Sequence, residues 1–555
     1  MKTTLNAALL ASISLVAACE SAPKAADPMP TAAAPANPAP QAAAPAARPA
    51  ATPKPAAAKA DAKDAGWTAD RSARLPGRPE DLSFKALDFT PPSAKDFRRT
   101  LPDGTPVYMA PSKEFPLVTL SLTFKGGAYM DPAEIPGLTE AMAVAVRTGG
   151  TTTVKPADLD ERLDFLATQA SVGARGNAIT ATMNCLKSNL DESMALFFDM
   201  LRNPGFDQAR LDILRGQAME GMKQRNDDAG AILGREWQYL MYGEDSFESR
   251  QPTEDGWEAV TPERLRAQHA RLVHPGNVII SVTGDFDPED MAARLAKAMD
   301  GWKRGEQVPN PPAPTHLVKP GVSHVAKDIP QGKVRVGRRS IQRDDPDYFA
   351  AEVMNDILGG GGFTSRLMKQ IRSNEGLAYS VGSRMGAGVY YPSTFAGSFE
   401  SKNPTVALAI KIMRDEFKRM QDQPVTAEEL DVAKKGFIEA FPSQFASKDA
   451  TLGILVADEW TGRDPEYWKT YRENIQKVTA DDVQRVARKY LNFDDMAIMV
   501  VGRWDEISQG DQGGRASMKD FWSGGRTELP LRDPMTMKPM DAPAPTDAPA
   551  PAGAR

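Results

Sequence analysis

The sequence predicts an α+β protein of two homologous halves, each with a largely antiparallel sheet that carries helices on one face. Two observations favour this fold class. Residues 259–286 align without a gap on residues 477–504, and self-similarity of this kind indicates that one structural unit occurs twice. Hairpin-like strand runs are followed by runs of helix, whereas a helix after every strand is typical of a doubly wound parallel sheet.

The repeat has the same internal order in both copies. Each copy starts with Val-Thr, continues with an amphipathic helix and a short loop, and ends in a β-rich run that closes on Gly284 or Gly502. A second similarity pairs residues 170–175 with residues 379–384. From these similarities we place two halves at 84–303 and 326–508, joined by a proline-rich linker at 304–325.

Strand-like runs alternate with longer helical patterns inside each half. In the first half the strand runs are Leu117–Lys125, Ala178–Cys185 and Val278–Thr283, and the helical runs are Asp158–Gln169, Leu190–Arg202 and Asp207–Arg225. The order of these runs supports a sheet with helices packed against it.

The amino terminus is typical of a secretory signal. Lys2 precedes an apolar stretch from Leu5 to Ala18, which is too short to span a membrane. The stretch ends in Leu-Val-Ala-Ala directly before Cys19, and this resembles the lipobox of bacterial lipoproteins. The resemblance implies that residues 1–19 are a lipoprotein signal peptide, that Cys19 is lipidated, and that the protein is anchored in the bacterial cell envelope facing the periplasm. Cleavage at Ala-x-Ala by ordinary signal peptidase is the alternative.

Both ends of the chain are rich in Ala and Pro. Ten prolines lie between Glu20 and Ala65, and chains of this composition bury too little apolar surface to fold. We therefore expect an extended tether over residues 20–80 and a low-complexity tail over residues 509–555.

Composition excludes several classes of protein. The 67 basic and 73 acidic residues give a net charge of only −6, so no strong electrostatic reason exists to expect nucleic acid as a partner. Two cysteines, Cys19 and Cys185, are too few for a disulfide framework. The four histidines are His269, His274, His316 and His324.

Residues 117–151 resemble the opening of the pitrilysin/insulinase-type zinc metallopeptidases, and the likeness extends over about residues 95–508. Members carry Gly-Leu-x-His-x-x-Glu-His at this point, an inverted zinc motif. This chain has Gly-Leu-Thr-Glu-Ala-Met-Ala-Val, in which Glu140 replaces the first histidine, Ala143 the general base and Val144 the second histidine. Zinc catalysis needs about three ligands and a base, so we predict no metal site in this chain.

The altered motif has a structural interpretation. Leu138, Ala141, Met142 and Ala145 follow the spacing of a core-facing helical stripe. Glu220 lies near the position of the downstream carboxylate ligand that the resemblance implies, but carboxylates without imidazole are a poor zinc site. His269 and His274 are interpreted as structural.

The second half keeps a pattern that the first half has lost. Residues 358–367, Leu-Gly-Gly-Gly-Gly-Phe-Thr-Ser-Arg-Leu, and the segment after them are similar to the carboxy-half pattern of the same family. The resemblance implies that Arg372 and Tyr379 contact a substrate carbonyl oxygen. A guanidinium and a phenol are donors that can stabilise a carbonyl or an oxyanion if they converge. They converge if Arg372 ends a helix and Tyr379 lies on the next strand; a surface Arg and a packed Tyr are the structural alternative.

The glycine run is a second candidate for substrate binding. It lacks the Gly-Lys-Ser/Thr ending of a phosphate-binding loop. We predict that Gly360 and Gly361 permit close backbone approach to an extended peptide, with plain helix termination as the alternative.

Together these features favour a non-catalytic, substrate-binding subunit of a bacterial envelope metallopeptidase. The resemblance implies a homologous partner that carries His-x-x-Glu-His and the zinc, while this chain binds no cofactor, is inactive alone and contacts the peptide substrate. In such two-chain enzymes the halves resemble a clamshell. Two alternatives remain: a structural or peptide-binding envelope protein of the same fold without a role in proteolysis, and an autonomous zinc metalloendopeptidase, against which the missing ligands argue.

Overall fold

The computed structural model describes residues 88–521 and 525–540, which from Thr90 onward belong to one compact unit. The predicted signal peptide with Cys19, the tether at 20–80 and the end of the tail at 541–555 lie outside the described residues. Within the described ranges, no helix is long and apolar enough to cross a membrane.

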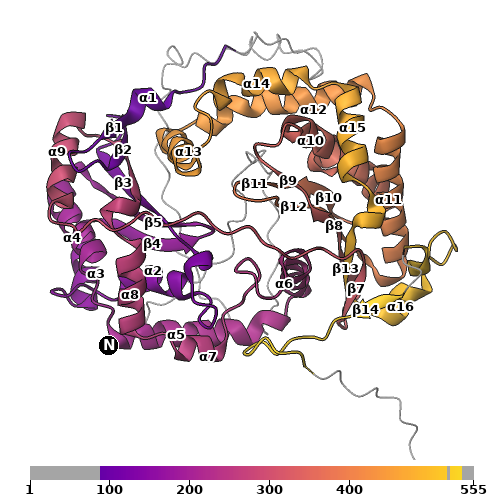
Figure 1. Ribbon diagram of the computed structural model, residues 1–555, viewed down its shortest axis with the longest axis horizontal. Coiled ribbons are helices and arrows are strands. Elements are labelled where there is room, and N and C mark those ends of the chain that lie inside the picture. Colours follow the sequence, from indigo (N-terminus) through magenta and orange to yellow (C-terminus); the bar gives the residue numbers. More distant parts are fainter. Residues whose placement is uncertain (1–87, 522–524, 541–555) are drawn as a thin grey trace, which may run out of the picture. The chain divides into compact units, whose positions relative to one another are not determined.

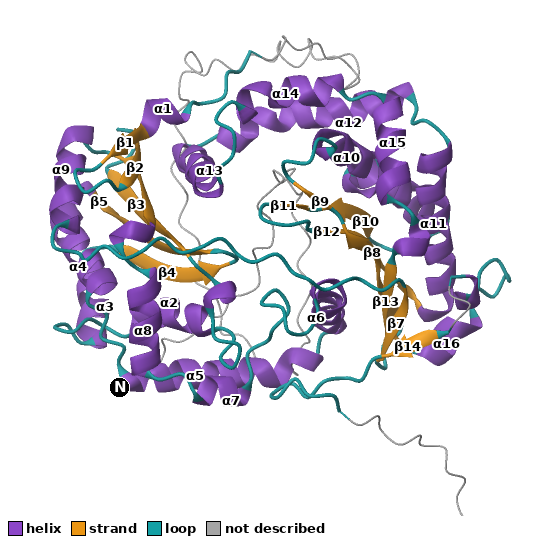
Figure 2. Cartoon of the chain, in the orientation of Figure 1, coloured by secondary structure: helices purple, strands orange, loops and turns teal. Residues whose placement is uncertain are grey.

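The first half contains a six-stranded sheet (Figure 2). Its spatial order is β1-β2-β6-β3-β5-β4, and within it β2 and β6 run parallel while the other neighbours are antiparallel. The strands are β1 (Arg98–Thr100), β2 (Pro106–Pro111), β3 (Leu117–Lys125), β4 (Gln169–Arg175), β5 (Ala178–Leu186) and β6 (Val278–Gly284). Because alternate residues of a strand point to opposite faces, Val118, Leu120, Leu122 and Phe124 bury one face of β3.

Helices cover the buried face of this sheet (Figure 1). The α-helices of this half are α1 (Ala94–Phe97), α2 (Leu138–Thr148), α3 (Pro156–Phe165), α4 (Leu190–Arg202), α5 (Gln208–Lys223), α6 (Ala229–Tyr242), α7 (Glu254–Glu258), α8 (Pro262–Leu272) and α9 (Pro288–Met299). Of these, α1 lies on the opposite face, where Ala94 and Phe97 pack against the cluster of Tyr108, Ala110 and Ile279, and α6 packs elsewhere, as described below. The predicted bounds of β3 and α4 are confirmed. The prediction for α3 was too long, because Ala167 adopts a left-handed φ of 49° and Gln169 already starts β4.

The second half contains another six-stranded sheet, of order β10-β12-β8-β13-β7-β14, and a short parallel ribbon of β9 and β11. The strands are β7 (Gly321–Ala326), β8 (Gln331–Arg339), β9 (Ile341–Gln342), β10 (Val381–Met385), β11 (Ala387–Gly388), β12 (Thr394–Lys402), β13 (Ala497–Gly502) and β14 (Arg526–Glu528). The α-helices are α10 (Tyr348–Asn355), α11 (Val406–Asp422), α12 (Ala427–Ala440), α13 (Lys448–Thr461), α14 (Tyr467–Lys477), α15 (Ala480–Tyr490) and α16 (Trp504–Gln509).

Short 3₁₀ and π-helical turns complete the described chain. The 3₁₀ turns are Ala128–Met130, Lys187–Asn189, Gln224–Asn226, Pro275–Asn277, Gly362–Thr364, Asn403–Thr405, Phe441–Phe445, Phe493–Asp495 and Met518–Asp520. The π-helical turns are η7 (Asp356–Gly360) and η9 (Met368–Asn374). Both π-helical turns flank the glycine run, and such turns occur frequently at functional sites.

Five strands of each sheet have the same topology, which confirms the predicted duplication, while the sixth strands, β1 and β14, differ in chain order and direction. Strand β6 lies between β2, to which it is parallel, and β3, to which it is antiparallel. Strand β13 lies in the same way between β7 and β8. The helix before each of these strands begins at a threonine N-cap, Thr261 or Thr479, whose side chain accepts a backbone hydrogen bond three residues on. The predicted pairing of residues 170–175 with 379–384 corresponds to β4 and β10, each an edge strand.

The halves also exchange one helix each, which the sequence analysis did not predict. Helix α6 packs on the second sheet, where Ile232, Trp237 and Met241 bury themselves against Met499 and Val501 of β13. Helix α13 packs on the first sheet (Figure 1), where Leu452 and Val456 meet Tyr108, Ala110 and Ile279. Along each strand, these residues alternate with the residues that face the larger helical layer of the same half. Each sheet therefore carries its exchanged helix on the face opposite that layer.

Two predicted boundaries need correction. Strand β7 begins at Gly321, inside the predicted linker. Strand β14 lies inside the predicted tail and pairs in parallel with β7, while Glu528 accepts a hydrogen bond from Nδ1 of His324 at 2.8 Å. The tail prediction was wrong for this part because backbone pairing at a sheet edge requires no apolar composition.

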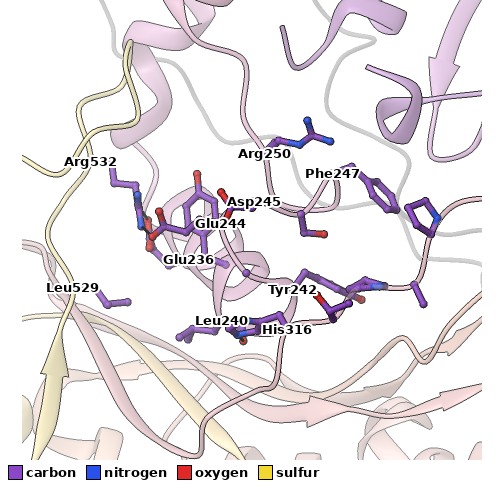
Figure 3. Close-up of a pocket in the computed structure, with 17 residues that line it drawn as sticks. Glu236, Leu240, Tyr242, Glu244, Asp245, Phe247, Arg250, His316, Leu529 and Arg532 are labelled. Carbon is purple, nitrogen blue, oxygen red and sulfur yellow. Dashed lines mark hydrogen bonds and ion pairs between the residues drawn. The ribbon is translucent and has the colours of Figure 1, made fainter. Parts of the chain in front are cut away.

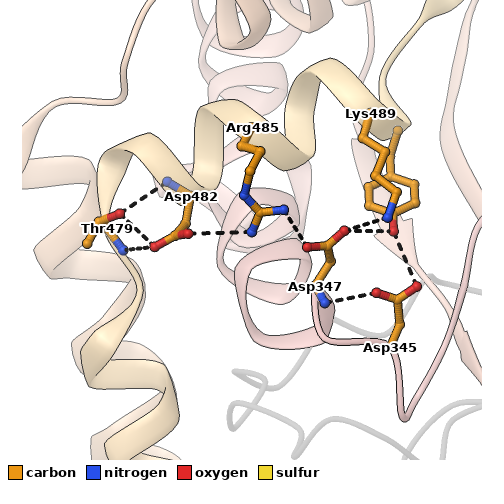
Figure 4. Close-up of polar contacts among 7 residues, drawn as sticks. Asp345, Asp347, Thr479, Asp482, Arg485 and Lys489 are labelled. Carbon is orange, nitrogen blue, oxygen red and sulfur yellow. Dashed lines mark hydrogen bonds and ion pairs between the residues drawn. The ribbon is translucent and has the colours of Figure 1, made fainter.

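A buried carboxylate connects α10 to α15 in the second half (Figure 4). Oxygen atoms of Asp347 lie 2.5 Å from a guanidinium nitrogen of Arg485, 2.7 Å from Nζ of Lys489 and 3.1 Å from the hydroxyl of Tyr490. Burial opposes ionisation of Asp347, but the hydrogen bonds from Lys489 and Arg485 outweigh it and hold the pKa of the carboxyl below its ordinary value.

Substitution Asp347→Asn is expected to lower the free energy of unfolding at pH 7 by about 2 kcal/mol, because it removes charge-assisted hydrogen bonds. A carboxyl whose pKa is lower in the folded than in the unfolded state stabilises the fold at pH values above its unfolded-state pKa. This stabilisation is lost as the pH falls through the folded-state pKa. The difference between wild type and variant should therefore shrink below about pH 4 in urea titrations. Asp431→Asn, which breaks an exposed pair with Lys435, is the control and should change stability by under about 0.5 kcal/mol. An equal effect of both variants would contradict this account.

Candidate functional site

Helix α2 holds the positions of the altered zinc motif. Asp131 supports its start by accepting backbone hydrogen bonds from Gly137 at 2.8 Å and Thr139 at 2.9 Å. Leu138, Ala141, Met142 and Ala145 are buried, which confirms the predicted core stripe.

The three motif positions on α2 differ in environment. Ala143 is also buried, Val144 is half-buried and Glu140 reaches solvent. Desolvation by the surrounding protein, together with the charge of Asp131, raises the pKa of Glu140.

The residues present do not fit a zinc ion. In the described part of the chain, no group of three or more His, Cys, Asp or Glu side chains is arranged to hold a metal. Glu220 is exposed on α5, where its carboxylate pairs with Lys223 of the same helix.

The histidines that were interpreted as structural are packed into the fold. Nε2 of His269 lies 2.9 Å from the carbonyl of Leu201, and burial lowers the pKa of this imidazole to about 4. Nε2 of His274 lies 3.2 Å from the carbonyl of Arg271.

The purified chain is therefore expected to bind no stoichiometric zinc at α2 and to cleave no peptide alone. Val144 offers no donor atom and Ala143 accepts no proton, so both a ligand and the base are missing. Metal analysis after dialysis against zinc checks the first point. One tightly held zinc per chain that is lost in Glu140→Ala would contradict the prediction.

The structure brings Arg372 and Tyr379 together. The Arg372 guanidinium carbon lies 4.8 Å from the ring centroid of Tyr379 and 4.8 Å from that of Phe363. Both rings face solvent, with Tyr379 84% and Phe363 72% exposed. The Arg372 side chain forms no ion pair or hydrogen bond with any residue that the structure describes. A cation between two exposed rings thus presents all its donors to an incoming acceptor.

Local structure explains why the pair converges. Arg372 lies in the last turn of η9, as predicted. Tyr379 does not lie on a strand as expected but in the loop two residues before β10. Gly376 has a left-handed φ of 64° directly after the helix, so the chain reverses there and returns Tyr379 beside Arg372.

The glycine run is required by packing within the chain. A Cβ atom on Gly359 would lie 2.4 Å from the backbone nitrogen of Ser383 in β10, so the helix end can approach this strand only without a side chain. Cβ atoms on Gly360 and Gly361 would lie 2.7 Å from the Asn355 amide and 2.8 Å from the Asp356 carbonyl. Helix termination therefore accounts for these glycines, and their contact with a substrate stays a prediction.

A groove of about 650 Å³ adjoins Tyr379. Strands β8, β10 and β12 form its floor, and Gly230 and Leu233 of the exchanged helix α6 form one wall. Its charged lining residues are Lys333, Arg335, Arg384 and Glu400. None of the α2 motif positions lines this groove, so the described chain does not combine the two predicted sites there.

Another cavity, of about 620 Å³, lies between α6, residues 312–316 and the C-terminal segment (Figure 3). Three of its charged side chains, Arg532, Glu236 and Glu244, pair with one another. Arg532 contacts Glu236 at 3.1 Å and also Glu244, and it stacks on the ring of Tyr239 at 4.4 Å. The cavity is therefore explained by docking of the C-terminal segment onto α6.

Comparison with known proteins finds one matching family model and several relatives. Residues 259–437 match the family model described as the peptidase M16 inactive domain, and this segment includes Arg372 and Tyr379. The non-peptidase homolog YmxG of Helicobacter pylori is 23% identical over 405 residues, 71% of this chain and 91% of that protein. An uncharacterized zinc protease of Streptomyces coelicolor is 26% identical over 352 residues, 59% of this chain and 74% of that protein.

The chain is related to the M16 peptidases. These are the pitrilysin/insulinase-type proteins that the sequence resembles. A solved structure of a peptidase M16 inactive domain from Pseudomonas fluorescens has the same fold, with a TM-score of 0.66 at 24% identity, and the match covers 73% of this chain and 98% of that chain. The relatives thus include both a protein named as a non-peptidase homolog and a protein named as an uncharacterized zinc protease.

Two residues near Arg372 and Tyr379 were missed by the sequence analysis. Phe363 lies inside the glycine-rich segment but was not singled out as a contact of Arg372. Arg335 was passed over, although Lys-Val-Arg-Val at 333–336 alternates charged and apolar residues and so indicates a strand with a charged face.

Proposed function

We propose that this chain is the non-catalytic, substrate-binding subunit of a bacterial envelope metallopeptidase of the M16 type. A homologous partner with an intact His-x-x-Glu-His motif would supply the zinc and the general base. The observation that carries the proposal is the guanidinium of Arg372, which pairs with no described residue, beside the exposed phenol of Tyr379. The zinc-motif positions of the same chain bear Glu140, Ala143 and Val144.

In this proposal the chain binds and orients the peptide. The guanidinium of Arg372 and the hydroxyl of Tyr379 donate hydrogen bonds to the carbonyl oxygen of the scissile peptide, and the same donors stabilise the negative charge that develops on that oxygen. The zinc of the partner supplies the activation of water. The ring of Phe363 also contacts the guanidinium.

The test is reconstitution with the homologous exported chain that carries His-x-x-Glu-His. Peptide turnover by that partner is measured alone and with an equimolar amount of this chain. The proposal expects a large increase in turnover and a stable complex in size-exclusion chromatography. A complex whose turnover equals that of the partner alone would instead support the second candidate, a peptide-binding protein of the same fold, which the name of the Helicobacter pylori relative favours.

The proposed location follows from the amino terminus. Cys19 follows small residues at the end of an apolar signal, and two or more acyl chains anchor a protein stably in a membrane. Cys19→Ser is expected to move the protein from the membrane fraction to the soluble envelope fraction, or to leave it unprocessed. Membrane fractionation and mass spectrometry of the amino terminus measure both outcomes. A correctly cleaved Ser variant that stays in the membrane fraction would contradict lipidation.

A further inference from the structure

The groove beside Tyr379 carries an excess of positive charge. Lys333, Arg335 and Arg384 line it, against the single carboxylate of Glu400. Lys333 and Glu400 form an ion pair across β8 and β12, so they neutralise each other. The guanidinium of Arg335 remains, and it lies in the same groove as the Tyr379 side chain.

Arg335 is the cation without a partner. Its side chain forms no ion pair or hydrogen bond with the residues that the structure describes, and its guanidinium carbon stacks on Trp237 of α6 at 5.6 Å from the ring centroid. Burial among these elements lowers the pKa of Arg335. Placing a guanidinium where it is partly desolvated costs free energy unless an anion or acceptor compensates, and the described chain provides none.

The duplicated half shows that this charge is not needed by the fold. Arg335 is paired with Met499 in the sheet, and the repeat aligns Met499 with Ser281, whose neighbour on β3 is Ser121. Ser121 therefore occupies the equivalent position, and its hydroxyl lies 3.0 Å from that of Thr182 on β5. The first half thus has a small, hydrogen-bonded residue at this position. The half that carries Arg372 and Tyr379 has a stacked cation there, which pairs with no described residue.

We propose that this groove is a carboxylate-binding subsite and that Arg335 is its principal contact, so that it selects peptides which place an acidic side chain or a free C-terminus beside the carbonyl held by Arg372 and Tyr379. The inference rests on the proposed function for the identity of the ligand as a peptide. A guanidinium matches the two oxygens of a carboxylate in a fork geometry, and stacking on Trp237 fixes its plane.

Fluorescence anisotropy with the full chain tests the subsite. The probes are fluorescein-labelled, alanine-rich decapeptides with one Glu at each position in turn, their Gln twins, and both sets with a free or an amidated C-terminus. The wild-type chain is expected to bind at least one Glu peptide, or the free-acid form, about tenfold more tightly than its neutral twin. A Glu/Gln difference assigns the ligand as a side chain, and a free-acid/amide difference assigns it as the C-terminus.

The variants separate Arg335 from a general electrostatic effect. Arg335→Gln should abolish the preference, Arg335→Lys should retain part of it as a point charge, and Arg338→Gln should leave it intact, because Arg338 lies on the opposite face of β8 and pairs with Asp495. The melting temperature of Arg335→Gln should stay equal or rise, since a desolvated charge is removed. A preference of equal size in wild type and Arg335→Gln, or no preference in wild type, overturns the subsite.

These outcomes are distinct from failure of the proposed function. A carboxylate preference that disappears in Arg335→Gln supports the subsite even if the chain does not raise the turnover of its partner. Conversely, if turnover rises with the chain but its Glu/Gln ratio is the same in wild type and Arg335→Gln, the proposed function stands and the subsite is wrong.

Discussion

Arg372→Ala is expected to lower the peptide turnover of the reconstituted two-chain enzyme about a hundredfold, while the complex still forms. Loss of one well-placed donor to a developing oxyanion typically costs a factor of about 10²–10³ in rate. Tyr379→Phe removes only a hydroxyl that lies on an 84% exposed side chain, so its effect on turnover should be of similar order. The measurement is kcat/KM of the partner with each variant at saturating complex.

The controls decide whether these effects belong to catalysis. Lys369→Ala removes an exposed cation from the same π-helical turn and should leave turnover unchanged. Thermal unfolding of all variants should match the wild type, because Arg372 has no ion pair with a described residue and Tyr379 is solvent-exposed. If Arg372→Ala and Tyr379→Phe both support full turnover, these residues have a structural role, and the function of the chain is limited to peptide binding.

Trp237→Ala should lower the free energy of unfolding by about 3–5 kcal/mol, the usual cost of deleting a buried aromatic side chain. Trp237 is 2% exposed and belongs to the cluster that α6 forms with β13. Phe165→Ala is the control, because Phe165 is 86% exposed and its truncation should cost about 0.5 kcal/mol or less. Urea titration followed by tryptophan fluorescence and circular dichroism compares the two.

The exchange of helices predicts which strands lose protection from amide hydrogen exchange in each variant. Helix α6 precedes the second half in the sequence but packs on the second sheet. Trp237→Ala, which removes part of this packing, should therefore accelerate amide hydrogen exchange in β8 and β13 and leave exchange in β3 and β5 unchanged. Leu455→Ala on α13 should have the reverse distribution and affect β2 and β6. Faster exchange in the first sheet of Trp237→Ala would contradict the packing of α6 on the second sheet.

Periodic features of the chain could be predicted because they depend on local sequence. The alternation of β3 and the amphipathic pattern of α4 each define a buried face within a few residues, and both elements were predicted with the observed bounds. The gap-free alignment of residues 259–286 with 477–504 predicted equivalent positions for α8-β6 and α15-β13, since a duplicated unit keeps its packing partners.

Several features could not be predicted because they depend on which surfaces meet. The apolar face of α6 indicates that the helix is buried but not against which sheet, so the exchange with α13 was missed. Strand β14 has a burial pattern without a core face and is held by backbone pairing. Tyr379 lies in a loop because Gly376 reverses the chain, and a single glycine does not specify the direction of that turn.

The sequence by itself determined the α+β class, the duplication, the replacement of the zinc-motif residues by Glu140, Ala143 and Val144, and the similarity to the M16 peptidases, because each depends on residue identity at fixed spacing. Only the tertiary structure decided that Arg372 stacks between Phe363 and Tyr379 and that Arg335 meets Trp237 of the exchanged helix in the adjoining groove. Both arrangements join residues from separate elements, and their geometry is set by packing of those elements and not by any local pattern.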